Sequence, residues 1–384
     1  MTSRVCVVAA GGTGGHMFPA EALARELTRR GWRIVLATDH RGEAYAQAFP
    51  AEERIALDAA TGRGPIGMAR AGVAIARGLF KARKALKRLD AAVVVGFGGY
   101  PSAPALLAAL SQGRPTLLHE QNSVLGRTNR WLSPYVGAVA ASFPNLRLVP
   151  PGVEARVGLI GNPVRPDIRT LFDRPYAAPK ARGPIHVLVT GGSQGASVLS
   201  QVVPDGLSLL PVSFRRRLQV THQARIEDID AARAKYAELS IAADLATYLP
   251  DLPEHLAWAH LVIARAGAST LSELTCAGRP AILVPLPSAT DDHQTVNARE
   301  MTAAGGARTI DQRNFTPVEL AKQMQRLGLD PSALQNAAAR ARSCGRPDAA
   351  RDLADLVESL AETGGDIPVG LAQPTTTKNG LAFA

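Results

Sequence analysis

A run of glycines directly after the first apolar segment constrains this chain more than any other feature of its sequence. Arg4 to Ala10 is a short β-branched run, and Gly11-Gly12-Thr13-Gly14-Gly15-His16 follows it at once. Helical spacing then extends from Pro19 to Arg30, and 34–38 is strand-like again. This order predicts a βαβ unit whose loop brings backbone N–H groups close to a phosphate or a sugar.

The glycine loop does not fit the dinucleotide fingerprint G-x-G-x-x-G, because His16 stands where that pattern would continue. A dinucleotide-dependent oxidoreductase is therefore disfavoured, and a tight turn without a ligand is the plain alternative. His16 is expected at the mouth of the loop, where an imidazole can accept a proton from an attacking hydroxyl.

The same order of elements returns in the second half of the chain. Five prolines interrupt 161–184, where we place a linker, and a second glycine loop follows at 191–195. Such short apolar runs are typical of parallel sheets covered on both faces, so the fold class is predicted to be α/β, with two Rossmann-like domains facing a cleft. Further strands are predicted at 92–95, 116–119, 136–140, 185–190, 261–264 and 281–284.

Charge and composition narrow the partners. The balance of 43 basic against 33 acidic residues gives +10, which favours nucleic acid, a phosphorylated metabolite or anionic lipid. Nucleic acid is the weakest of these, because no binding motif is recognisable. The three cysteines read as reduced core thiols. The sequence has no run of about 18 apolar residues that would predict a membrane-spanning helix. We therefore expect a cytosolic protein or one attached to a membrane from one side.

One segment, 63–88, has eight basic residues and no acidic one. As a helix it would place a core stripe on one side, and Val73 and Phe80 would project among cations on the other. Apolar residues ringed by cations suit an anionic bilayer, although a solvated basic face fits the composition equally well. The predicted membrane patch is Val73, Arg77, Phe80, Lys84 and Lys87, and the predicted core stripe is Met68, Ile75, Leu79 and Leu86.

Three further segments carry candidate chemistry. A third glycine loop lies at 96–101. In 265–273, Glu273 either caps a helix together with Ser269 or accepts the hydroxyls of a ribose. Gln294 and Asn297 would share a helix face and could bind sugar hydroxyls. Metal binding at the preceding acidic pair is disfavoured, because adjacent carboxylates seldom converge on one ion.

Taken together, these loops resemble the MurG family of transferases. The matching stretches follow the family order over about residues 4–360. They are Gly11 to His16 with Phe18-Pro19, Gly96 to Tyr100, His119 to Asn122, Gly161 to Arg165, Gly191 to Ala196, Arg265 to Glu273, and Gln294 with Asn297.

The resemblance implies a GT-B architecture. Residues 1–162 would form an N-terminal domain that holds the acceptor and faces the membrane, and 163–344 a C-terminal domain that holds UDP-N-acetylglucosamine. A final helix at about 345–362 is expected to pack back on the first domain, and 364–384 to be a disordered tail.

The resemblance also implies an inverting reaction that needs no metal or cofactor. N-acetylglucosamine would pass from UDP to the N-acetylmuramyl hydroxyl of lipid I, giving lipid II for peptidoglycan at the cytoplasmic face of the bacterial inner membrane. His16 would be the base, and Gly98, Gly99 and Tyr100 would contact the acceptor. The implied donor contacts are Thr13, Gly14, Gly15, Asn122, Arg165, Ser193, Leu249, Ser269, Glu273, Gln294 and Asn297.

Two alternatives stay open. A UDP-N-acetylglucosamine 2-epimerase would share the fold, but it uses carboxylates, whereas the first loop carries a histidine and glycines. A non-catalytic scaffold for wall-synthesis proteins would keep the fold and the basic patch, and the intact donor positions argue against it.

Overall fold

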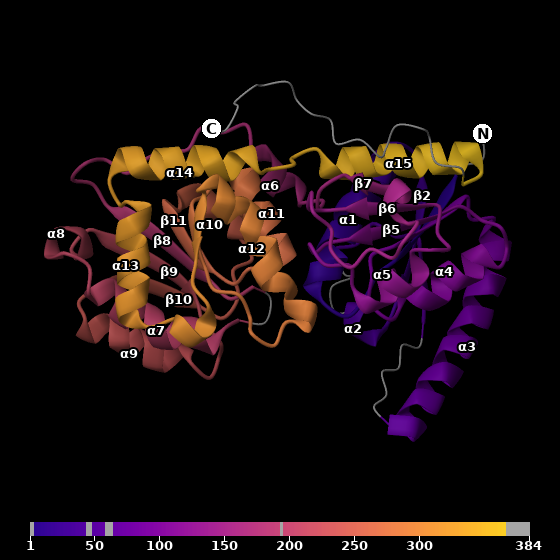
Figure 1. Cartoon of the computed structure of the whole chain (residues 1–384), viewed down its shortest axis with the longest axis horizontal. Coiled ribbons are helices and arrows are strands. Elements are labelled where there is room, and N and C mark those ends of the chain that lie inside the picture. Colours follow the sequence, from indigo (N-terminus) through magenta and orange to yellow (C-terminus); the bar gives the residue numbers. More distant parts are fainter. Residues whose placement is uncertain (1–3, 44–47, 58–63, 193–194, 366–384) are drawn as a thin grey trace. The chain divides into compact units, whose positions relative to one another are not determined.

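The computed structural model describes residues 4–43, 48–57, 64–192 and 195–365, and it contains two parallel sheets, each with helices on its faces (Figure 1). The predicted α/β class with two Rossmann-like sheets is confirmed. Contacts divide the chain into two compact units, one formed by 1–12, 23–161 and 351–384, and the other by 13–22 and 162–350.

The first sheet has seven parallel strands in the order β3-β2-β1-β4-β5-β6-β7. The order reverses beside β1, because β1 pairs with β2 on one side and with β4 on the other. The strands are β1 (Val5–Ala9), β2 (Arg33–Thr38), β3 (Glu53–Ala56), β4 (Val93–Gly96), β5 (Thr116–Glu120), β6 (Ala138–Ala141) and β7 (Val157–Leu159).

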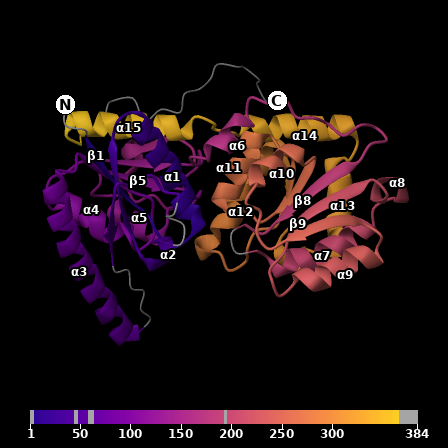
Figure 2. The ribbon, with the colours of Figure 1, turned by 180° about the vertical axis from the view of Figure 1, so that it is seen from behind.

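Helices cover both faces of this sheet. Side chains of α3, α4 and the α5 region share one core cluster with alternate residues of the strands, and Figure 2 shows α1 in front of the sheet when it is seen from behind. The helices are α1 (Gly14–Arg29), α2 (His40–Glu43), α3 (Gly64–Leu89), α4 (Ser102–Leu110), α5 (Arg127–Leu132), η1 (Glu154–Arg156) and α15 (Ala349–Thr363).

The second sheet has six parallel strands in the order β10-β9-β8-β11-β12-β13, so the order reverses beside β8 as it does beside β1. Its strands are β8 (Ile185–Thr190), β9 (Leu218–Gln223), β10 (Ala242–Ala246), β11 (Leu261–Ala264), β12 (Ala281–Leu283) and β13 (Ala307–Thr309). Its helices are α6 (Pro166–Thr170), α7 (Ser197–Ser208), α8 (Val212–Arg215), α9 (Ile229–Glu238), α10 (Leu252–Trp258), α11 (Ala268–Ala277), η2 (Thr290–Asp292), α12 (His293–Ala304), η3 (Gln312–Asn314), α13 (Pro317–Leu327) and α14 (Pro331–Ser343).

Helix α15 is tied to the first unit by charged groups. Arg30 Nη1 donates to Asp355 and Glu358 at 2.6 Å each, and Trp32 Nε1 donates to Glu358 at 3.0 Å. The helix begins at Ala349, later than the predicted start at about 345. Of the predicted disordered tail 364–384, the first two residues are described, and the Gly365 N–H donates to the Leu360 carbonyl at 3.0 Å. The rest, from 366 onward, lies outside the described residues.

The basic segment is a helix, as predicted. In α3, Leu86 is fully buried and Leu79 packs against the core, whereas Val73 is 52% and Phe80 is 72% exposed. The side chain of Met68 lies outside the described part of the structure. No helix among the described residues is long and apolar enough to cross a membrane.

Two buried histidines predict how stability depends on pH. Burial lowers the pKa of His222 and that of His260 to about 4; His260 is also lowered by nearby His186 and Arg279. His222 Nδ1 lies 2.9 Å from the Tyr236 hydroxyl. Because the unfolded chain binds protons at about pH 6.5 and the folded one does not, stability present above pH 6.5 is lost as pH falls toward 4.

We expect His222 to lower the free energy of unfolding in urea by about 2 kcal/mol between pH 7.5 and 5.0, and the less buried His260 to add a smaller share. His222→Gln should remove the contribution of His222 to this pH-dependent loss of unfolding free energy, whatever the substitution does to stability at pH 7.5. An unchanged slope in that variant would show that His222 is charged in the folded protein.

Candidate functional site

The glycine loops leave the carboxyl ends of strands at the two points where strand order reverses. The first glycine loop follows β1, and the loop of Gly98 follows its neighbour β4. In the second sheet, the 191–195 loop follows β8, and Arg265 follows its neighbour β11. Ligands of doubly wound sheets bind at such switch points, so both sheets offer a candidate site there.

A buried carboxylate shapes the first glycine loop. Asp39 Oδ1 accepts the N–H of Gly12 at 3.1 Å and that of Gly42 at 2.9 Å, and Arg41 Nε donates to its Oδ2. Burial acts to raise the pKa of Asp39, but these donors outweigh it and hold the pKa below its ordinary value. A Cβ at Gly11 would lie 2.7 Å from Asp39 Oδ1, so this approach requires glycine.

Of the predicted base and donor residues of this loop, Gly14, Gly15 and His16 lie in the first turn of α1, and Thr13 directly precedes it. The helix begins at Gly14, earlier than the predicted start at Pro19, and the His16 N–H donates to the Thr13 carbonyl at 3.1 Å. The His16 side chain is half-buried. The helix therefore starts inside the glycine run and carries the histidine at its N-terminal end.

Glu120, the last residue of β5, plays a similar part for the loop of Asn122. Its carboxylate accepts the N–H of Asn122 at 3.0 Å, that of Gly126 at 2.9 Å, and the amides of Asn122 and Asn129. Burial raises the pKa of Glu120 against the pull of these donors. The loop that presents Asn122 is thus built around one carboxyl group.

The predicted acceptor loop adopts a conformation that needs glycine. Gly98 and Gly99 have φ of 82° and 74°, and the Ser102 hydroxyl donates to the Gly99 carbonyl at 2.8 Å. Tyr100 beside them is 46% exposed.

Gln223, which the sequence analysis missed, braces the second glycine loop. This buried residue ends β9; its Oε1 accepts from the Thr190 hydroxyl at 2.7 Å, and its Nε2 donates to the carbonyl of Gly192 at 3.1 Å and to that of Thr247 at 3.5 Å. One amide thus links the glycine loop to the segment that leads to Leu249, which is 8% exposed. Ser193, a predicted donor contact, lies outside the described residues.

The N-terminal end of α11 has no side-chain cap. Its N-cap residue is Gly267, and the Ser269 hydroxyl is buried without a hydrogen-bond partner. Uncapped N–H groups and a free hydroxyl at a helix start can receive an anion. The capping alternative for Glu273 is wrong, because this residue lies in the second turn of the helix and accepts from Arg165.

Arg165 and Glu273 form a largely buried ion pair at 3.3 Å. Burial raises the pKa of Glu273 although Arg165 lowers it, and Arg165 Nε is buried without a partner. Both side chains therefore retain hydrogen-bonding capacity that a polar ligand could use.

Three polar side chains hold the neighbouring loops. Arg265 donates to the carbonyls of Val284 and Pro285 and, at 2.6 Å, to Gln312. Gln294 Oε1 accepts the N–H of Leu286 at 3.0 Å, and Asn297 Nδ2 donates to the Ala266 carbonyl at 3.3 Å. Gln294 and Asn297 thus bind backbone groups of the neighbouring loops. Among the described residues, no group of three or more His, Cys, Asp or Glu could hold a metal.

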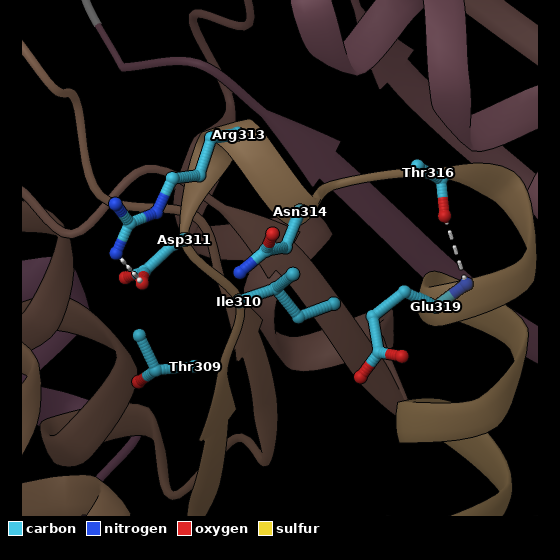
Figure 3. Close-up of a pocket in the computed structure, with 7 residues that line it drawn as sticks. All are labelled: Thr309, Ile310, Asp311, Arg313, Asn314, Thr316 and Glu319. Carbon is cyan, nitrogen blue, oxygen red and sulfur yellow. Dashed lines mark hydrogen bonds and ion pairs between the residues drawn. The ribbon is translucent and has the colours of Figure 1, made fainter.

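A hollow of about 660 Å³ lies beside β13, and no predicted site residue lines it; Figure 3 shows the residues that do. Its charged groups are already paired, Arg313 with Asp311 at 3.5 Å and Glu319 with Lys322 at 3.7 Å. We assign no ligand to it. Its lining residues are Thr309, Ile310, Asp311, Arg313, Asn314, Thr316 and Glu319.

Known proteins resemble this chain over nearly its whole length. Residues 6–141 match the glycosyltransferase family 28 N-terminal domain, and residues 186–355 match the glycosyltransferase family 28 C-terminal domain. A relative from Caulobacter vibrioides, named UDP-N-acetylglucosamine--N-acetylmuramyl-(pentapeptide) pyrophosphoryl-undecaprenol N-acetylglucosamine transferase, is 54% identical over 361 residues, 94% of this chain and 99% of the relative.

Two solved structures bear on the fold. Acinetobacter baumannii MurG has a TM-score of 0.76 at 31% identity, over 93% of this chain and 99% of that one. A putative UDP-N-acetylglucosamine 2-epimerase from Listeria monocytogenes has a TM-score of 0.66 at 16% identity, over 96% of this chain and 100% of that one. The second likeness is one of fold alone.

The Gln223 brace gives a prediction for UDP binding. Gln223→Leu keeps the volume but leaves Thr190 and two loop carbonyls without their partner, so the loop shifts and UDP should bind about tenfold more weakly, as isothermal calorimetry would measure. Tyr236→Phe, which removes a buried hydroxyl from His222 in the same core, is the matched control and should leave UDP affinity unchanged. Equal UDP affinity in Gln223→Leu and the wild type would contradict the brace.

Proposed function

Because the chain belongs to glycosyltransferase family 28, and within it to the MurG transferases, we propose that it moves N-acetylglucosamine from UDP-N-acetylglucosamine to the N-acetylmuramyl hydroxyl of lipid I, giving lipid II. The identity of 54% with the Caulobacter vibrioides transferase, over 94% of this chain, is the observation that carries the proposal.

The reaction inverts the anomeric carbon in a single displacement. The acceptor hydroxyl gives its proton to His16, its oxygen forms the new bond to the anomeric carbon, and the bond from that carbon to the UDP oxygen breaks. The support for His16 is its place in the first turn of α1, directly after the glycine loop that Asp39 shapes. Thr13, Gly14, Gly15 and Asn122 are proposed donor contacts, and Gly98, Gly99 and Tyr100 are proposed acceptor contacts.

The leaving diphosphate is stabilised by the uncapped start of α11. The first-turn N–H groups and the unpartnered Ser269 hydroxyl meet its negative charge, with Ser193 and Arg165 as further donors. Glu273 accepts the ribose hydroxyls, and Leu249 lies beside the uracil. In this proposal Gln294 and Asn297 contact the sugar, while their hydrogen bonds to Leu286 and Ala266 set the loops around it.

The membrane contact is a separate part of the proposal. The apolar side chains Val73 and Phe80 are exposed on α3, and so are Arg77, Lys84 and Lys87. This arrangement favours peripheral binding of α3 to the anionic surface of the cytoplasmic face of the bacterial inner membrane. The lipid-linked acceptor would be met there.

A labelled-donor assay tests the reaction. With UDP-N-acetylglucosamine labelled in the sugar and a lipid I analogue, label should enter the lipid, whereas label in epimerised sugar, or in neither product, would reject the transferase.

His16→Ala should lower kcat by at least about a hundredfold while UDP-N-acetylglucosamine affinity changes little, because a base acts in the transition state. A near-normal kcat in that variant would remove His16 from the mechanism.

A charge reversal tests the membrane contact. Phe80→Glu with Lys84→Glu should abolish cosedimentation with phosphatidylglycerol vesicles, because it removes an apolar anchor and reverses a cation. The matched control is Val318→Glu with Lys322→Glu. These residues have the same spacing on the exposed face of α13, and the variant should bind like the wild type. Unchanged binding of the α3 variant would leave the patch a solvated face.

A further inference from the structure

The exposed apolar side chains of the first unit are unevenly distributed. Among its described residues, every exposed large hydrophobic side chain lies between Val73 and Leu148. Two of them belong to α3. Two aromatic ones are Trp131, in the last turn of α5 and 56% exposed, and Tyr135, in the turn after α5 and 65% exposed. The full set is Val73, Phe80, Tyr100, Trp131, Tyr135 and Leu148.

The same stretch concentrates positive charge. From Arg77 to Val153 the sequence has ten Lys and Arg residues against two acidic ones, a net charge of +8 within a chain of +10. Asp90 pairs with Arg114 at 3.3 Å and Glu53 pairs with Arg88, so each cancels one of these charges, whereas Glu120 is buried under four N–H donors. The basic residues are Arg77, Lys81, Arg83, Lys84, Lys87, Arg88, Arg114, Arg127, Arg130 and Arg147.

Helices α3 and α5 lie on one face of the first sheet. Ala82 and Leu86 of α3 and Leu132 of α5 belong to the same core cluster, together with alternate residues of β1 such as Val5 and Val7. Trp131 directly precedes Leu132, and Tyr135 directly precedes the buried Val136, so each aromatic residue adjoins an anchor in that core. One helical layer therefore carries both sets of exposed apolar residues.

We propose that Trp131 and Tyr135 form a second membrane anchor, which enters the headgroup region of the same anionic bilayer that α3 contacts. Tryptophan and tyrosine favour the membrane interface, because an apolar ring carries one polar group. The occupant is a lipid surface and not an acidic protein, because the exposed side chains are apolar rings set among cations and the acceptor is itself anchored in lipid. This inference rests on the proposed membrane contact of α3.

The three tryptophans of the chain make a direct test possible. Trp32 is buried at 6% exposure and Trp258, which stacks on His186, is half-buried, so Trp131 at 56% is the most exposed of the three. Phosphatidylglycerol vesicles whose acyl chains carry bromine should quench the fluorescence of Trp131 in the bound protein. Trp131→Phe should still bind these vesicles, but its tryptophan fluorescence should not be quenched. Trp131→Ala with Tyr135→Ala should bind these vesicles about tenfold more weakly.

The controls separate this inference from the proposed function. Leu209→Ala, at a residue 51% exposed in the second unit, should bind like the wild type. Wild-type binding without tryptophan quenching, or unchanged binding of the double variant, would overturn the second anchor while α3 keeps its role. Absence of wild-type binding would overturn both contacts, and the label assay on a water-soluble acceptor analogue would still report on the transfer reaction.

Discussion

Buried polar side chains at the strand ends hold the loops on which the proposed site depends. Where a parallel strand ends, its backbone groups lose their ladder partners and need others. Asp39 accepts the N–H of Gly12 from the end of β2, and Gln223 donates to the carbonyl of Gly192 from the end of β9. β2 pairs with β1 as β9 pairs with β8, so corresponding strands brace the two glycine loops, with opposite hydrogen-bonding polarity.

The two buried carboxylates of the first unit have pKa values shifted in opposite directions. Asp39 has Arg41 beside it and keeps a pKa below its ordinary value, whereas Glu120 has only N–H donors and burial raises its pKa. Each carboxylate accepts several donors at fixed positions, which a single amide or hydroxyl could not do. The conformations of the first glycine loop and of the loop that carries Asn122 are consequently fixed by the fold before any ligand binds.

Sequence patterns predicted the interior strands and the glycine loops, but not the sheet edges. β3, β7, β10 and β13 are the four edge strands; they are three to five residues long, and β3 and β10 are largely exposed, so no buried apolar run marks them. β9 is interior but was missed because its end, Thr221 to Gln223, is polar although buried. His222 is paired with Tyr236 of α9, and Gln223 with Thr190 and the glycine loop. Gln223 was missed as a site residue for the same reason, since its partners come from segments distant in the sequence.

The α1 start shows how local rules fail at a site. Pro19 and the glycine run suggested that the helix begins after the loop, yet it begins at Gly14 with Pro19 inside it. A proline there removes a hydrogen bond to the Gly15 carbonyl, and glycine is a poor helix former, so this first turn is costly for its sequence. The glycines instead let a ligand approach the backbone closely beside His16. A costly loop-to-helix junction of this kind is expected where ligand binding matters more than helix stability.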